Sequence, residues 1–110
     1  TRSFIEKNSD LIQRFVNALY KAQIWVQEHS AKEIAEVVAP SFPDTDMRIL
    51  ESSIQRYKDI EAYAASPVMR EEAFERLQTI MSEAGELKQK APYDKVINNK
   101  FAQAAVDSIK

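Results

Sequence analysis

Apolar side chains recur along most of the chain at steps of three and four positions, the spacing that places them on one side of an α-helix. The pattern is clearest from Glu71 to Ala84, where charged and hydroxyl residues take the opposite side. Gly85 follows at the position where a left-handed residue commonly ends a helix. The stripe consists of Ala73, Phe74, Leu77, Ile80, Met81 and Ala84. We expect it to need a partner surface, because a helix of this length is stabilised mainly by packing.

A second and longer pattern of the same period predicts a helix from Ser9 to about His29. Asn8 precedes it as an expected N-cap, and Asp10 lies in the first turn, where the helix dipole favours a negative charge. The apolar positions form a wide stripe of Leu11, Ile12, Phe15, Val16, Leu19, Ala22 and Val26. This helix is predicted to be the longest element of the chain.

Capping residues mark the next two helices. Ser30 and Glu33 have the spacing of a capping box, in which each side chain binds the backbone of the other residue. The short helix that they open is expected to close at Pro40. Either Thr45 or Asp46 is suited to cap the helix that follows the turn.

That helix is predicted to run to about Ile60, after which residues 61–67 either extend it or break into a loop. Beyond the Glu71–Ala84 helix, Asp94 is expected to start a short turn, and Asn98 or Asn99 to cap a last helix. No stretch alternates with the period of a β-strand. We therefore predict an all-α chain of five or six helices, with residues 1–110 forming a single helical segment.

Composition supports the helical interpretation and narrows the function. The chain of 110 residues has one glycine, whereas average usage of about 7% would give about eight. Few tight turns and no phosphate-binding loop are therefore possible. The net charge is −2 with charges of both signs interspersed, so no basic surface for nucleic acid is expected. The absence of cysteine excludes disulfides and thiolate metal sites.

No group of residues has the pattern of a catalytic centre. His29 is the only histidine and is expected at a helix end, while the carboxylates fall on solvent-facing positions or caps. We therefore predict no enzymatic activity, no catalytic residue, no metal site and no cofactor. Four aromatic residues could stack on a small ligand, although packing is the commoner role of such side chains: Tyr20, Trp25, Tyr57 and Tyr63.

Over nearly its whole length, the chain resembles the C-terminal region of one protein family. The segments that carry the likeness are KNSDLIQRFVNALYKAQIWVQEHSAKEIAEVVAPSFPDTD, ESSIQRYKDIEAYAASPVMREEAFERLQTIMSEAGEL and APYDKVINNKFAQAAV. The matching positions are Asn8, Trp25, Ser30, Glu33, Arg56, Tyr57, Pro67, Ala84, Gly85, Pro92, Tyr93 and Asp94. The family is that of solute-binding proteins of ABC importers for nitrate, alkanesulfonates, taurine and thiamine-precursor pyrimidines. Ser9, Met47 and Tyr63 depart from residues common in the family.

The resemblance implies a protein larger than this chain. Its members have two α/β lobes that close on a small solute, and this chain resembles the helical return into the first lobe. It implies capture of a solute that needs the upstream lobes, delivery to an ABC permease, and a periplasmic or lipid-anchored location at the outer face of the cytoplasmic membrane. Because ligands sit at the ends of strands, no ligand residue is assigned beyond the candidates Tyr57 and Tyr63.

Two further expectations concern the chain by itself. A free-standing helical module that binds a partner helix is the alternative to the importer hypothesis. If the chain is separated from the sheet of a parent lobe, its helices must either repack on one another or leave an apolar patch exposed, and a two-fold dimer is the simplest way to cover such a patch. We expect the chain to self-associate as a homodimer through Phe15, Leu19, Phe74, Leu77 or Met81.

Overall fold

The computed structural model describes residues 1–109, in which all regular structure is helical and no strand occurs. The elements are α1 (Arg2–Lys7), α2 (Ser9–Glu28), α3 (Ala31–Val38), the 3₁₀ helix η1 (Ala39–Ser41), α4 (Met47–Asp59), α5 (Glu71–Glu83), α6 (Tyr93–Val96) and α7 (Lys100–Ser108). The all-α prediction is confirmed. Seven α-helices are described rather than five or six, because α1 and α6 are short helices where the sequence indicated only an apolar segment and a turn.

The local signals that mark helix ends are confirmed at three joints. The Ser30 hydroxyl accepts from the Glu33 amide, and the Glu33 carboxylate accepts from the Ser30 amide, which completes the capping box of α3. Asp46, rather than Thr45, caps α4 through the amide of Arg48. Gly85 has φ of +80°, and two backbone hydrogen bonds around it close α5 as a Schellman motif.

Two asparagines at predicted caps have other roles. Asn8 lies between α1 and α2, and its side-chain amide donates to the carbonyl of Phe4 at the end of α1 rather than capping α2. Before α7, the side-chain oxygen Oδ1 of Asn98 accepts from the amide of Lys100, whereas Asn99 occupies the N-cap position without a side-chain cap bond.

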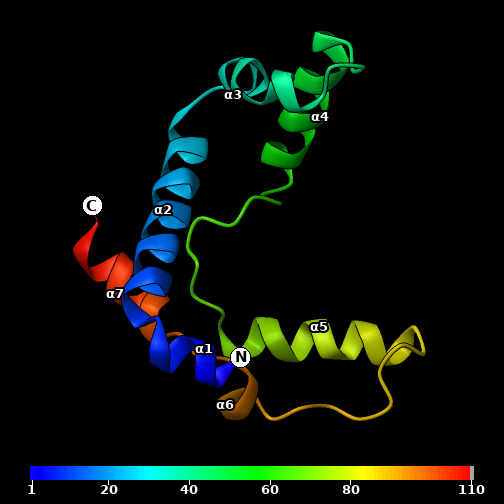
Figure 1. Cartoon of the computed structure of the whole chain (residues 1–110). Helices are drawn as coiled ribbons and strands as arrows, with labels where there is room; N and C mark the ends of the chain where they lie inside the picture. Colours follow the sequence, from blue (N-terminus) through cyan, green and yellow to red (C-terminus); the bar gives the residue numbers. More distant parts are fainter. Residues whose placement is uncertain (110) are drawn as a thin grey trace.

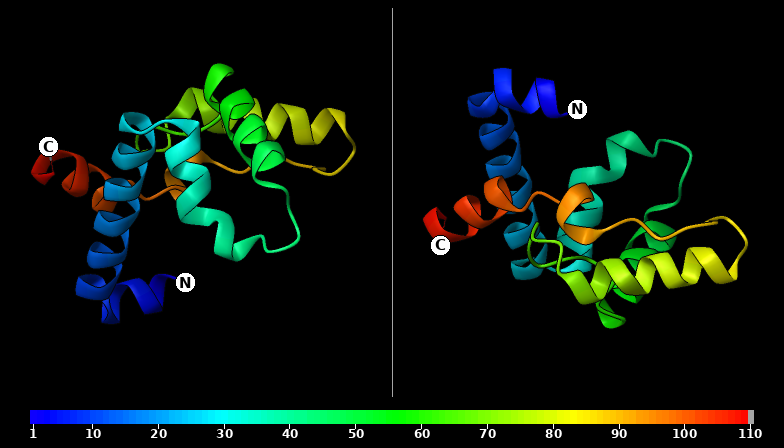
Figure 2. Two further views of the ribbon diagram at one scale, coloured as in Figure 1. Left: turned by 90° about the horizontal axis from the view of Figure 1, so that it is seen from above. Right: turned by 90° about the horizontal axis from the view of Figure 1, so that it is seen from below.

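The helices form an open arrangement rather than a compact globule (Figure 1). Helix α2 runs along one side of the molecule, and α7 packs across it (Figure 1). Helices α3 and α4 form one arm, and α5 with the loop that returns to α6 forms a second arm (Figures 1 and 2). The extended segment 62–70 joins the arms along α2.

The main apolar core lies within the first arm, where α3 packs on α4. Trp25, Val26 and Tyr63 cover its edges, so the end of α2 and the start of the joining segment are fixed to it. The buried members of this core are Ala31, Ile34, Ala35, Leu50 and Ile54. Three of the five are leucine or isoleucine and two are alanine, so this core is small for the length of the chain.

Lys58, near the end of α4, binds the C-terminus of α2. The Lys58 ammonium group donates to the carbonyl oxygens of Val26 at 2.7 Å and of His29 at 2.8 Å, at the C-terminus of α2. These carbonyls lie where a helix leaves acceptors unpaired and the dipole favours a cation. Lys58 therefore ties the end of α4 to the end of α2.

Replacement of Lys58 by methionine is expected to lower the free energy of unfolding by about 1–3 kcal/mol, because both carbonyls lose a charged donor. Lys88→Met is the matched control, since Lys88 is exposed and its substitution should change stability by less than about 0.5 kcal/mol. Urea unfolding followed by circular dichroism measures both. Equal effects of the two substitutions would contradict the role assigned to Lys58.

The second arm is held by side-chain amides instead of an apolar core. The Asn99 side chain accepts from the Met69 amide at 2.9 Å and donates to the Met69 carbonyl at 2.7 Å, as a neighbouring strand would. The Tyr93 hydroxyl donates to the same carbonyl at 2.6 Å and accepts from Asn99. These bonds join the start of α5, α6 and α7.

Gln78 repeats this arrangement further along α5. Its amide oxygen accepts from the Ala91 amide at 2.6 Å, and its nitrogen donates to the Ala91 carbonyl at 3.2 Å. The loop after Gly85 is thereby held against α5, and the rings of Phe74 and Tyr93 meet at 6.0 Å. Phe74 and Gln78 are consequently the buried residues of α5.

Candidate functional site

The two tyrosines considered for ligand contact lie next to each other. The ring of Tyr57 meets that of Tyr63 edge-on, with centroids 6.0 Å apart. Tyr57 is half exposed, whereas Tyr63 is partly buried against the core of the first arm, and its carbonyl accepts from Gln27. A hollow of about 500 Å³ beside them is lined by Gln27, Lys58, Glu61, Tyr63, Ala64 and Ala65. Tyr63 therefore packs against the core, and Tyr57 stays half exposed.

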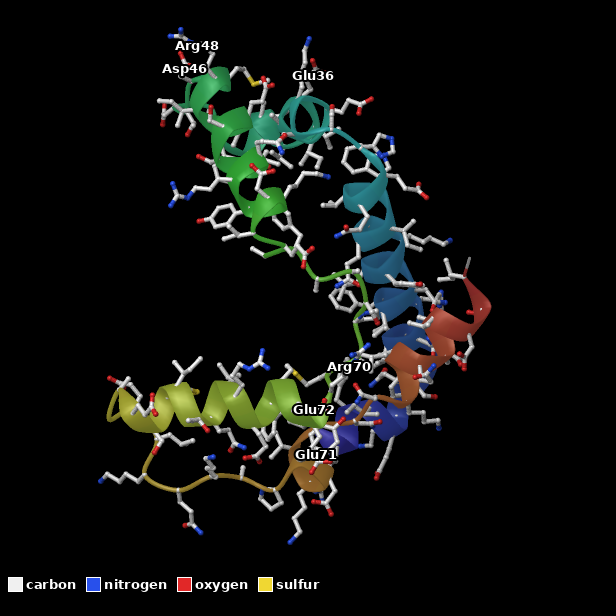
Figure 3. All side chains as sticks on the ribbon, turned by 180° about the vertical axis from the view of Figure 1, so that it is seen from behind. Glu36, Asp46, Arg48, Arg70, Glu71 and Glu72 are labelled. Atoms are coloured by element: carbon white, nitrogen blue, oxygen red, sulfur yellow. The ribbon has the colours of Figure 1, made fainter. Side chains whose placement is uncertain are left out.

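The titratable groups in the described part of the chain are dispersed. Residues 1–109 contain no group of three or more histidine or acidic side chains that could hold a metal ion. His29 is at the end of α2, where its ring stacks on Trp25 at 4.2 Å and its Nδ1 lies 2.7 Å from the Trp25 carbonyl oxygen. In Figure 3 the labelled charged side chains lie at two separate places, the tip of the first arm with Asp46 and Arg48, and the start of α5 with Glu71.

The capping box gives one pH dependence. The Ser30 amide and then its hydroxyl donate to the Glu33 carboxylate and hold the pKa of Glu33 below its ordinary value of 4.5. A lowered folded-state pKa contributes stability that is present above the unfolded pKa and is lost as the pH falls through the folded pKa. The melting temperature should therefore fall below about pH 4.5, and Glu33→Gln should remove part of that fall. An identical profile for wild type and variant, measured by circular dichroism, would contradict this role.

An apolar surface on α2, here named the α2 face, is exposed in the described part of the chain. It consists of Leu11, Phe15, Ala18, Leu19 and Ala22, all exposed and on one side of the helix. Phe15 leaves 67% of its surface exposed and Leu11 53%. No charged or hydrogen-bonding side chain interrupts the face, so it offers packing and nothing else.

A similar surface on α5 is here named the α5 face. It consists of Ala73, Leu77, Ile80, Met81 and Ala84, all exposed. The stripe that the sequence predicted also includes Phe74, which lies at its edge and is buried beside Tyr93, whereas Leu77, Ile80 and Met81 are exposed. One edge of the apolar stripe on α5 is thus covered by the loop that follows the helix, and the rest of the stripe is uncovered.

The dimensions of the molecule show how much surface lacks a partner. The chain exposes 8635 Å². A compact monomer of 12.6 kDa exposes about 6,200 Å². The radius of gyration is 16.9 Å, whereas about 13 Å is usual for this length. The excess of about 2,400 Å² means that the described helices do not enclose a full domain core.

An apolar groove of about 450 Å³ continues the α2 face. Leu19 belongs to both, and the groove runs from it between α1, α2, the joining segment and α7. Ile12 and Val16 form its α2 wall, and Phe101 its α7 wall. The groove and the two faces are the candidate functional surface, and its chemistry is binding by burial of apolar area.

The expected self-association now has a more exact location. Phe15, Leu19, Leu77 and Met81 are exposed as it requires, whereas Phe74 is buried within the chain and drops out. We predict that light scattering across a dilution series will show dimers at high concentration, which Phe15→Glu reduces and the neighbouring Arg14→Glu does not. A monomer at every concentration would contradict this prediction.

Comparison with known proteins gives one informative match. Over 102 residues the chain is 42% identical to a protein of Bacillus subtilis (strain 168) named "Putative binding protein YtlA". The match covers 93% of this chain and 30% of the relative. No protein-family model matches the sequence, and no solved structure matches. The relative's name describes a binding protein, without a ligand or a transporter.

No helix of residues 1–109 is long and apolar enough to cross a membrane.

Proposed function

We propose that the chain is the C-terminal helical part of the substrate-binding component of an ABC importer. In this role it helps to capture a small solute outside the cytoplasmic membrane, such as nitrate, a sulfonate, taurine or a pyrimidine, and to deliver it to a permease. The observation that carries the proposal is the 42% identity, over 93% of the chain, to a protein named as a binding protein. The location is periplasmic or lipid-anchored, and the role needs no catalysis and no cofactor.

The geometry of the matched residues supports this proposal. Ser30 and Glu33 form a complete capping box, Gly85 adopts a left-handed conformation that favours glycine, and Tyr93 binds the Met69 carbonyl. The residues that resemble the importer family therefore lie at helix ends and between helices, where they fix the arrangement of the helices. A solute site built mainly from the remainder of a longer protein agrees with the dispersed polar groups of this chain.

The proposal is tested with the polypeptide expressed from the complete natural reading frame. Differential scanning fluorimetry against nitrate, alkanesulfonates, taurine and pyrimidines should give a stabilising shift with one class, because a ligand that binds only the folded state raises the melting temperature. Calorimetric titration of that class should give micromolar binding. The 110-residue chain alone is the control and should bind none of them.

Tyr57 provides a more specific variant in that experiment. Tyr57→Ala in the complete protein removes its exposed ring, and Tyr20→Ala removes a tyrosine of α2 that is not part of the Tyr57–Tyr63 pair. If Tyr57 contacts the solute, its loss should weaken binding by about tenfold or more, the usual scale of a stacked aromatic contact. Equal affinity of both variants would exclude Tyr57 from the site, and absence of binding by the complete protein would reject the importer.

The alternative is a helical interaction module, which the exposed α2 and α5 faces favour. It requires a reading frame that begins just before Thr1, whereas the importer requires one that continues upstream through glycine-rich strands. Determining that reading frame separates the two hypotheses.

A further inference from the structure

We propose that the α2 face and the α5 face together form an internal docking surface, covered by an apolar layer of the same polypeptide that lies outside this chain. The proposal rests on the longer protein of the proposed function. It adds which residues meet that layer: Phe15 and Leu19 on α2, and Leu77, Ile80 and Met81 on α5.

The two faces have the chemistry of a buried interface. Both consist of uninterrupted apolar side chains, with alanines that allow close approach beside the large residues. Interfaces between partners that separate are as polar as ordinary surface, whereas permanent interfaces resemble a domain core. The two faces have the composition of a core that lacks one layer.

The uncovered surface is too large for one ordinary protein interface. A standard interface between two proteins covers about 800 Å² on each partner, a third of the excess exposed here. A second copy of this chain bound through one such interface would leave most of the excess uncovered. The occupant must therefore be large and must reach two helices that run in different directions (Figure 1).

A longer polypeptide can supply such a layer. In the B. subtilis relative, the matched region is 30% of the polypeptide, so most of that protein lies outside it. A layer from the same polypeptide is present at a high effective concentration, which a separate partner lacks. It also explains why α5 covers Phe74 with its own loop but leaves Ile80 exposed on another side.

The absence of cysteine from the chain allows a direct test. Phe15→Cys and Ile80→Cys each introduce a single thiol on a face, and Ser82→Cys introduces one on the exposed polar side of α5. Each variant is made in the 110-residue chain, diluted until it is monomeric, and in the complete natural polypeptide. Alkylation by iodoacetamide is followed by mass spectrometry of the peptide that contains the new thiol.

We expect the thiols at positions 15 and 80 to react quickly in the chain and at least about 100-fold more slowly in the complete polypeptide, because burial limits reaction to opening events. The Ser82→Cys thiol should react at similar rates in both. Equal rates at all three positions would overturn the proposal, as would a reading frame that encodes only these 110 residues. Protected thiols in a polypeptide that binds no importer solute would retain the docking surface and reject the importer.

Discussion

Replacing Asn99 by alanine is expected to lower the free energy of unfolding by about 2–4 kcal/mol. The side-chain amide binds both the N–H and the C=O of Met69 and also the Tyr93 hydroxyl, in a half-buried position. Its removal leaves the Met69 amide without that partner, and each unpaired buried group costs about 1–3 kcal/mol. Urea unfolding with far-ultraviolet circular dichroism gives the difference.

Gln103→Ala is the matched control for Asn99→Ala. Gln103 is an exposed amide on α7 that donates to Asp107 one turn away, and its loss should cost less than about 0.5 kcal/mol. Asn99→Asp provides a second comparison, because it retains the acceptor for the Met69 amide but removes the donor to the Met69 carbonyl. A cost of Asn99→Ala as small as that of Gln103→Ala would show that the amide does not hold the second arm.

Phe74→Ala is expected to cost about 3–5 kcal/mol, the usual range for a buried phenylalanine. Phe74 is only 8% exposed and packs beside Tyr93, so the substitution leaves a cavity between α5 and the loop that follows it. Ile80→Ala, on the same helix and 58% exposed, should cost less than about 1 kcal/mol in the 110-residue chain. The pair of variants separates the covered side of α5 from the uncovered side.

The comparison has a clear contrary outcome. If Ile80→Ala destabilises the monomeric chain as much as Phe74→Ala, then the α5 face is buried within one chain in solution. The chain would then have no exposed α5 face to serve as a docking surface. If the two costs differ as expected, the same pair measured in the complete polypeptide should show Ile80→Ala becoming costly as well.

The helices and most of their ends followed from the sequence because the signals are local. Apolar spacing, the Ser30–Glu33 box, Asp46 and Gly85 each act within a few residues, and the structure retains them. Helix α1 was missed because its six residues carry too short a pattern, although Thr1 accepts from the Phe4 amide as its cap.

The two amide clamps were not foreseeable because they depend on residues distant in the chain. Asn99 has the local signature of a helix cap, yet its side chain binds Met69, thirty positions earlier. Gln78 reads as a polar position on α5, and only the return of the loop to Ala91 buries it. The same loop decides that Phe74 is covered while Leu77 and Ile80 are not.

The candidate surface was predicted in part, since apolar stripes on α2 and α5 that need a partner follow from spacing alone. Which side of α5 remains uncovered depends on Gln78 and Tyr93, and so required the structure. For the tyrosines, the residue type alone suggested ligand contact. The structure instead packs Tyr63 against the core of the first arm.

The most direct test of the account is native-state hydrogen exchange of the backbone amides of α2, α4 and α5. It is measured in the 110-residue chain and in the complete natural polypeptide. The account predicts that amides of α2 and α5 exchange at least about tenfold more slowly in the complete polypeptide, with a smaller change in α4, whose core is already present in the chain. Equal protection of α2 and α5 in both polypeptides would contradict it.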